Sequence, residues 1–382
     1  MAPTSLIDAA SSLRAALGGA SEGLVDREVI VELVALAAVA REHMLVIGPP
    51  GTAKSEAVRR VSASLGARYF EYLLGRFTEP SEILGPVDLR RLREGVVETE
   101  TAGMLPEAEI AFLDEVFLGS TAILNTLLGV LNERVFRRGH THKVCPLRVC
   151  VGASNSVPDD ESLAAFADRF LVRAYLGPVG DPQLELLLEG GWASAQPRER
   201  PKASMADLDL LVEASVRADM TTIRPDLARA LRLLRGAGIA LSDRRSVKVQ
   251  RLIAAAAALA GRASPTSADL WPIVYAVPGE DAQRMAREVL RDLLAPSENR
   301  ALSAAVEDAS AGPSARASRL LNAAESVFAS PPSETDPDAI ARWRLRLEGV
   351  AREMDAAFSS DSMPAALKAM RARIVSAVQG SA

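Results

Sequence analysis

The chain has 382 residues, of which 48% are hydrophobic and 24% are charged, the balance of a folded globular protein and not of a disordered one. Its two cysteines, Cys145 and Cys150, exclude a disulfide-stapled scaffold and suit a reducing compartment. The net charge of −5 argues against a surface that attracts nucleic acid everywhere, and no apolar run reaches the roughly 20 residues of a membrane span. We therefore expect a soluble, cytoplasmic protein of two or three domains.

The first half of the chain alternates amphipathic segments with short apolar runs. Apolar residues at helical spacing predict helices at residues 5–17, 26–40, 54–65 and 120–132. Short apolar runs predict buried strands at residues 44–47, 69–74, 110–113, 148–153 and 169–175. Because strands that alternate with helices pair in parallel, we predict an α/β domain over residues 1–178, with a mostly parallel sheet flanked by helices.

The second half shows helical signals only. Amphipathic segments at 206–216, 226–237 and 247–260 predict an all-α domain over residues 179–277. Two more, at 338–358 and 363–378, predict a C-terminal helical region over residues 278–382.

A glycine-rich loop joins the first predicted strand to the next helix, with the sequence Gly48-Pro49-Pro50-Gly51-Thr52-Ala53-Lys54-Ser55. Such a loop binds phosphate through backbone N–H groups and the helix N-terminus, while its lysine reaches the β- and γ-phosphates. We therefore predict that residues 48–55 and the adjoining Glu56 bind ATP and that the Ser55 hydroxyl ligates Mg²⁺. Ala53 stands where the usual pattern has a second glycine, and we expect it to keep a negative φ.

Polar side chains follow two other predicted strands. Asp114 and Glu115 end the apolar run Ile110–Leu113, and Asn155 follows the run that ends near Ser154. Asp114 is placed to hold Mg²⁺, and Glu115 to orient and activate an attacking water. The Asn155 amide can hydrogen-bond the γ-phosphate or that water, although asparagine at a strand end is also an ordinary turn residue.

These motifs resemble the MoxR group of AAA+ ATPases, with the RavA branch as the most similar that we can name. The resemblance extends from about residue 23 to about residue 262, and alanine in place of the second loop glycine is usual in that group. Besides the phosphate loop, it rests on the acidic motif at 112–117, the helix at 121–134, the segment Leu105–Glu109 and the run Ser242-Asp243-Arg244-Arg245.

The resemblance implies an AAA+ P-loop domain, an all-α lid and a hexameric ring with ATP at each subunit junction. Asn155 matches sensor 1, and Arg169 matches the arginine finger that completes a neighbour's site, with Arg173 as the alternative. Arg244 matches sensor 2, which would contact the γ-phosphate of its own subunit, but the adjacent Arg245 keeps that choice open.

Further implications concern the base and the partners of the ring. Val25 and Asp26 occupy the place where such proteins hold adenine through backbone contacts. Two hairpins are expected, at residues 85–99 and 135–144; the first corresponds to an insertion that projects toward the pore in MoxR relatives. Either hairpin could contact a substrate or only pack the ring. Relatives commonly work with a protein that bears a von Willebrand factor A (vWA) domain, so we expect such a partner.

Other interpretations fit less well. His140, His142, Cys145 and Cys150 lie close together, but their spacing is not that of a zinc ribbon or finger. The leading functional hypothesis is an ATP-driven remodeller of another protein. The alternatives are a nucleic-acid-directed motor, disfavoured by the acidic charge, and a scaffold whose assembly is controlled by nucleotide.

Overall fold

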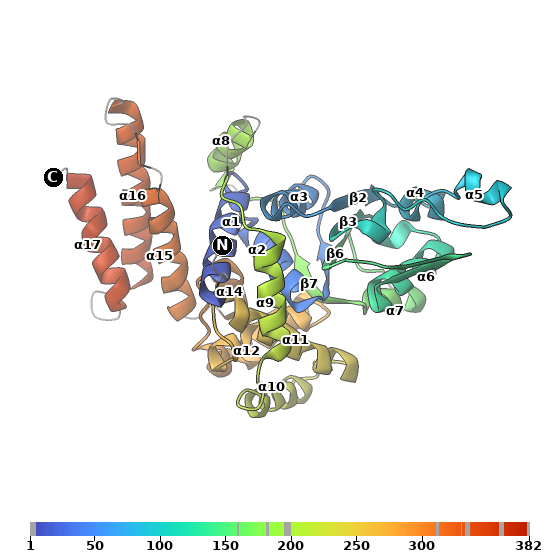
Figure 1. Ribbon diagram of the computed structural model, residues 1–382. Helices are drawn as coiled ribbons and strands as arrows, with labels where there is room; N and C mark the ends of the chain where they lie inside the picture. The colour runs from blue at the N-terminus through green and yellow to red at the C-terminus, as the bar shows by residue number, and fades with distance from the viewer. Residues whose placement is uncertain are drawn as a thin grey trace.

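The computed structural model describes residues 5–158, 160–180, 183–194, 200–310, 313–329, 331–332, 337–358 and 363–379. An α/β part lies in the middle, with lid helices below it (Figure 1). Three C-terminal helices form one end of the molecule, and a narrow arm that carries α5 forms the other. Within the described residues, no helix is long and apolar enough to cross a membrane.

The five strands that the sequence predicts are confirmed, and they form one parallel sheet in the order β2-β3-β6-β1-β7. They are β1 (His43–Ile47), β2 (Tyr69–Leu73), β3 (Ile110–Asp114), β6 (Val149–Ser154) and β7 (Phe170–Tyr175). Because all five run the same way, everything that follows a strand begins at one edge of the sheet. This carboxyl edge holds each polar residue that the sequence places at a strand end.

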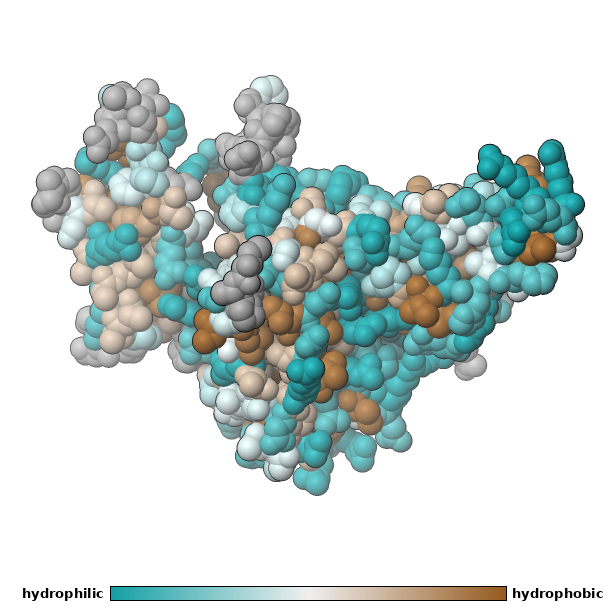
Figure 2. Space-filling model, viewed as in Figure 1, coloured by the Kyte–Doolittle hydropathy of each residue, from teal (hydrophilic) through white to brown (hydrophobic). Residues whose placement is uncertain are grey.

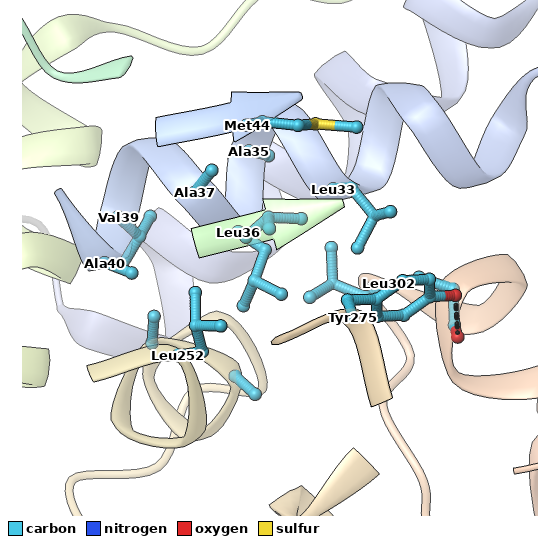
Figure 3. Close-up of a cluster of buried hydrophobic side chains, with 14 of the residues drawn as sticks. Leu33, Ala35, Leu36, Ala37, Val39, Ala40, Met44, Leu252, Tyr275 and Leu302 are labelled. Carbon is cyan, nitrogen blue, oxygen red and sulfur yellow. Dashed lines mark hydrogen bonds between the residues drawn. The ribbon is translucent and has the colours of Figure 1, made fainter. Parts of the chain in front are cut away.

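The helices of the α/β part confirm the predicted order. They are α1 (Leu6–Ser21), α2 (Glu28–Ala40), α3 (Lys54–Leu65), α4 (Pro80–Leu84), α5 (Leu89–Arg93), α6 (Thr121–Glu133) and α7 (Glu161–Ala167). Helix α2 has 11 buried residues out of 13. A helix that is apolar on all sides belongs inside a protein. Its Leu33 and Leu36 pack in a cluster with Met44 of the sheet and Leu252 of the lid (Figure 3).

The lid and the helices that follow it share this core. They are α8 (Leu184–Ser194), α9 (Met205–Arg217), α10 (Arg224–Gly236), α11 (Asp243–Leu259), α12 (Glu280–Val289), α13 (Arg291–Leu294) and α14 (Ser303–Ser310), with a 3₁₀ segment at Trp271–Ala276. The buried Glu32 of α2 accepts hydrogen bonds from the backbone N–H groups of Ala304 and Ala305 and so caps α14. One continuous core therefore runs from α1 to Ala309.

The last three helices, α15 (Pro313–Ala329), α16 (Pro337–Ala357) and α17 (Ala365–Gln379), bury a separate core that includes Leu320, Leu347 and Leu367. The two cores thus part between Ala309 and Ala317. The division of the chain at residues 178 and 278 stays a prediction.

The arm differs in part from its predicted form. Residues 85–99 pair only at the stem, through the bridge between Val87 and Thr99, and the tip is the helical turn α5, which Asp88 caps. The second predicted hairpin is confirmed as β4 (Val135–Arg138) and β5 (Thr141–Val144). The backbone N–H of His140 donates to the Val97 carbonyl, which joins the two projections. Exposed Leu89 and Leu92 lie among arginines at the tip, where Figure 2 shows hydrophobic and hydrophilic surface together.

Candidate nucleotide-binding site

The glycine-rich loop connects the carboxyl end of β1 to the N-terminus of α3, as predicted. A Cβ on Gly48 would lie 2.6 Å from the Leu176 carbonyl oxygen, so only glycine fits beside the chain that leaves β7. The Lys54 ammonium donates to the carbonyls of Gly48 (2.8 Å) and Pro49 (2.9 Å). Burial lowers the pKa of Lys54, while the nearby Asp114 and Glu115 carboxylates oppose that shift. The loop thus closes around its own lysine.

Ala53 corrects one expectation. Its φ is +58° and its ψ is 27°, the left-handed conformation and not the expected negative φ. This is the conformation that the glycine of the usual pattern adopts without steric cost. Alanine therefore keeps the loop geometry but bears strain at this residue.

Replacing Ala53 with glycine should relieve that strain. We expect the free energy of unfolding to stay equal or rise by up to about 1 kcal/mol, because glycine tolerates φ of +58° although it loses more backbone entropy. Chemical denaturation of the two proteins checks this. Ala63→Gly, inside helix α3, is the matched control and should destabilise by roughly 0.5–1 kcal/mol. Equal losses at both positions would contradict the strain at Ala53.

The acidic motif and Asn155 meet the loop at the carboxyl edge. Strand β6 lies between β3 and β1, so Asp114, Asn155 and Gly48 follow three adjacent strands. The Asn155 amide donates to Glu115 Oε1 at 2.7 Å. The backbone N–H of Glu115 donates to Asp114 Oδ1, and Glu115 itself is left-handed, with φ of +49°. The two carboxylates thus have different hydrogen-bond partners, so one can serve a cation and the other a water.

Arg27 is a part of the site that the sequence reasoning missed. Its side chain is buried, and it donates from Nε to the Thr52 carbonyl (2.8 Å) and from Nη2 to the Gly177 carbonyl (2.9 Å). Arg27 therefore holds the Val25–Asp26 segment against the phosphate loop, where those residues were expected. The sequence feature that could have indicated Arg27 is its position directly before an apolar helix.

Glu56 lies one turn inside α3, and its carboxylate is already engaged. It accepts from Arg59 Nη1 at 2.8 Å and from Arg60 Nε at 2.7 Å. Arg60 in turn donates to the Glu22 carbonyl. The Glu56 side chain thus ties α3, through Arg60, to the loop before Val25.

Arg169 and Arg173 lie in different surroundings. Arg169 is half-buried and lines a pocket of about 590 Å³ with Phe117, Leu124 and Phe166. It precedes Phe170, which pairs with His43 at the amino end of β1, so it lies far from its own phosphate loop. Arg173 is buried and donates to the carbonyls of Pro278 and Ala167. Arg173 is thus bonded within its own subunit, whereas Arg169 borders a pocket.

The contact predicted for sensor 2, between Arg244 and this subunit's own site, is not formed in the structure. Arg244 donates to Asn132 Oδ1 at 2.8 Å, next to Leu131, whose carbonyl contacts the His43 ring. His43 begins β1, whereas the phosphate loop follows its other end, about 13 Å of strand away. Arg245 is buried and bonded to Asp168 and to the Leu171 carbonyl at the same amino edge. The lid packs its helix α11 there, which puts both arginines out of reach.

A metal centre of the zinc type finds no support in the described part of the chain. No group of three or more His, Cys, Asp or Glu side chains is placed to hold a metal ion there. Cys150 is fully buried, and burial raises the pKa of its thiol to about 12. By contrast, the Ser55 hydroxyl and the Asp114 carboxylate are hard oxygen donors at the mouth of a phosphate loop, a set that fits Mg²⁺.

Comparison with protein families gives a match over residues 11–213 to the MoxR domain of MoxR–vWA–beta-propeller ternary systems. The chain belongs to the MoxR family. Residues 215–286 match an AAA lid domain. The matched segment includes helix α11, which carries Arg244 and Arg245. MoxR-type AAA+ architecture thus accounts for both the parallel sheet and the helical lid.

Two curated relatives and a solved structure are also similar to this chain. Two uncharacterised proteins of Methanocaldococcus jannaschii are 33% identical over 250 residues and 34% identical over 247 residues, each match covering 64% of this chain. The matches span 66% and 64% of those relatives, just under two thirds of their length. A crystal structure of a presumed ATPase from Cytophaga hutchinsonii superposes with a TM-score of 0.61 at 14% identity, covering 77% of this chain and 96% of that one, which shows a shared fold.

Proposed function

We propose that this MoxR chain hydrolyses ATP. The observation that carries the proposal is the convergence of three elements on one edge of the sheet: the phosphate loop with Lys54, the Asp114–Glu115 pair and Asn155. Lys54 and the loop N–H groups bind the phosphates, and Val25 with Asp26 binds adenine through the backbone. Glu115 takes a proton from the attacking water, and Asn155 positions the Glu115 carboxylate for that step.

Magnesium belongs to the same proposal. Ser55 at the start of α3 and Asp114 at the end of β3 would hold it, and bound Mg²⁺ supplies charge that neutralises the phosphates. In this assignment Glu115 does not hold the metal ion. Its carboxylate accepts a hydrogen bond from Asn155 and can act on the water.

The proposed active form is a ring in which Arg169 serves the neighbouring subunit. Arg169 cannot serve its own site, since it lies at the amino edge of the sheet. Its Nε is buried and lacks a hydrogen-bond partner among the described residues, and the side chain borders an open pocket. A guanidinium in that state is available to a phosphate that another subunit brings.

The proposed role is to remodel or activate a partner protein. A vWA-domain protein is the partner that we propose, because the matched family model describes MoxR domains in systems with such a protein. The two joined projections, residues 85–99 and the β4–β5 hairpin, extend from the α/β part and are the proposed contact surface (Figure 1). A specific kinship with the RavA branch stays a prediction.

Replacing Lys54 with alanine tests the phosphate site. We expect affinity for ATP to fall about ten- to a hundredfold, because an ammonium that bonds the phosphates is lost. Lys202→Ala, which removes an exposed lysine outside the site, is the matched control and should bind normally. Calorimetric titration with ATP measures both, and normal affinity in Lys54→Ala would refute the proposed site.

A further inference from the structure

A second pocket lies at the amino edge of the sheet, on the far side from the phosphate loop. Its volume is about 380 Å³, at the lower end of the range for small-molecule sites. Arg41 and Arg134 come from the α/β part, while Val216, Met220 and Arg251 come from the lid. The pocket therefore lies at the junction of the two parts, and an occupant would contact both.

Positive charge exceeds negative charge around this pocket. The cations that interact there are Arg41, Arg134, Arg148, Arg244, Lys248 and Arg251, and the carboxylates are Glu42 and Asp209. Six positive groups against two negative ones leave an excess of positive charge in a chain whose net charge is −5. The C-termini of α2, α6 and α9 also end here, and each adds roughly half a negative charge, which lowers the positive excess without cancelling it.

This crowding of cations acts on the arginines themselves. Burial lowers the pKa of Arg134 to about 10, and the neighbouring Arg41 adds to that shift. Burial also lowers the pKa of Arg41, and Arg148 and Arg251 add to it. Burial is the larger cause of both shifts, and the neighbouring cations act in the same direction.

Backbone strain points to the same place. Five described residues other than glycine have a positive φ. Three of them, Asp26, Ala53 and Glu115, belong to the candidate nucleotide site. The other two are Arg41 (φ +53°) and Arg134 (φ +52°), which end α2 and α6 and border the second pocket. Strain of this kind concentrates at functional sites.

The two strained arginines differ in what occupies their side chains. Arg134 donates to the carbonyls of Leu131, Leu147, Arg148 and Arg41, so it builds the pocket wall. The Arg41 side chain is exposed and makes no hydrogen bond or ion pair with any described residue. A helix end of this type favours glycine, so the fold does not account for an arginine at position 41.

We propose that this pocket binds a small phosphorylated molecule. A phosphate monoester carries about two negative charges, which suits a pocket with an excess of positive charge, and the planar guanidinium groups of Arg41 and Arg251 suit its oxygens. The uncharged part of the molecule lies against Ala40, Val216, Met220 and Ala254. Such a ligand links the end of α2 to α11 and so ties the lid to the α/β part at the edge opposite the phosphate loop.

Titration calorimetry with phenyl phosphate tests the proposal. All measurements use the full chain with Lys54→Ala, which disables the phosphate loop as a competing site. We expect saturable binding of one equivalent, weakened about tenfold or more by Arg41→Gly and by Arg251→Gln. Glycine suits φ of +53°, so Arg41→Gly should keep or raise the melting temperature, which shows that the binding loss is not a loss of fold.

Arg284→Gln is the matched control. Arg284 and Arg251 are 67% and 63% exposed, and each is ion-paired, but Arg284 lies on α12 away from the pocket. The control should bind phenyl phosphate within twofold of its parent. Absence of binding at millimolar phenyl phosphate, or an equal weakening by Arg284→Gln, would overturn the proposal.

Discussion

Replacing Glu115 with glutamine should nearly abolish ATP turnover and leave ATP binding intact. Glutamine has the same shape and its carbonyl oxygen can still accept from the Asn155 amide, but it cannot take a proton from water. General-base catalysis contributes about 10²- to 10⁴-fold, so we expect kcat to fall by that factor. Asp114 and Ser55 are unchanged, and for this reason the affinity for Mg²⁺ and ATP should stay within a few-fold. Steady-state phosphate release and ATP titration measure the two quantities.

The control is Glu213→Gln, an exposed glutamate on α9 outside the site, which should leave kcat unchanged. A Glu115→Gln protein that hydrolyses ATP at the unmodified rate would eliminate Glu115 as the base. If the unmodified protein assembles with ATP but shows negligible turnover, the nucleotide-controlled scaffold is the better description of this chain.

Arg169→Ala should lower turnover by about 10³-fold or more, the usual contribution of an arginine finger. Because Arg169 lies at the amino edge, away from its own phosphate loop, the loss should appear only in junctions between subunits. Mixing inactive Arg169→Ala subunits with inactive Lys54→Ala subunits should therefore restore part of the activity. Some junctions then combine an intact Lys54 with an intact Arg169 from its neighbour.

A matched mixture tests that interpretation. Lys54→Ala subunits mixed with the double variant Lys54→Ala/Arg169→Ala contain no intact phosphate loop and should stay inactive. Turnover per subunit should also rise with protein concentration as rings form, with sizing of the same samples as a check. An active monomer, or no recovery in mixtures shown to co-assemble, would exclude Arg169 as an arginine finger.

Lid packing also bears on the second pocket. Helix α11 carries Arg244, Arg245, Lys248 and Arg251, and all four side chains meet the amino edge of the sheet. Arg245 is buried and fixed to β7, whereas Arg251 stays largely exposed. Arg245 of α11 thus holds the lid against the sheet, and Arg251 of the same helix stays accessible to a ligand.

The sequence by itself determined the local features of this protein. The strands, the main helices of the α/β part, the phosphate loop and the acidic strand end depend on neighbouring residues. Apolar runs, helical spacing and glycines reveal them without knowledge of the fold. Asn155 could be placed at the same edge as the acidic pair in advance, because parallel strands bring their carboxyl ends to one edge, but its hydrogen bond to Glu115 depends on β6 lying beside β3.

Only the tertiary structure decided which arginines face which partners. Arg27 meets Gly177 across 150 residues, Arg173 meets Pro278 across 105, and Arg244 meets Asn132 across 112. The left-handed backbone of Ala53 likewise follows from the closed loop and not from the preference of alanine. Arginine side chains are long and bond any carbonyl or carboxylate within reach, so their roles depend on how separate elements pack, which spacing along the chain does not encode.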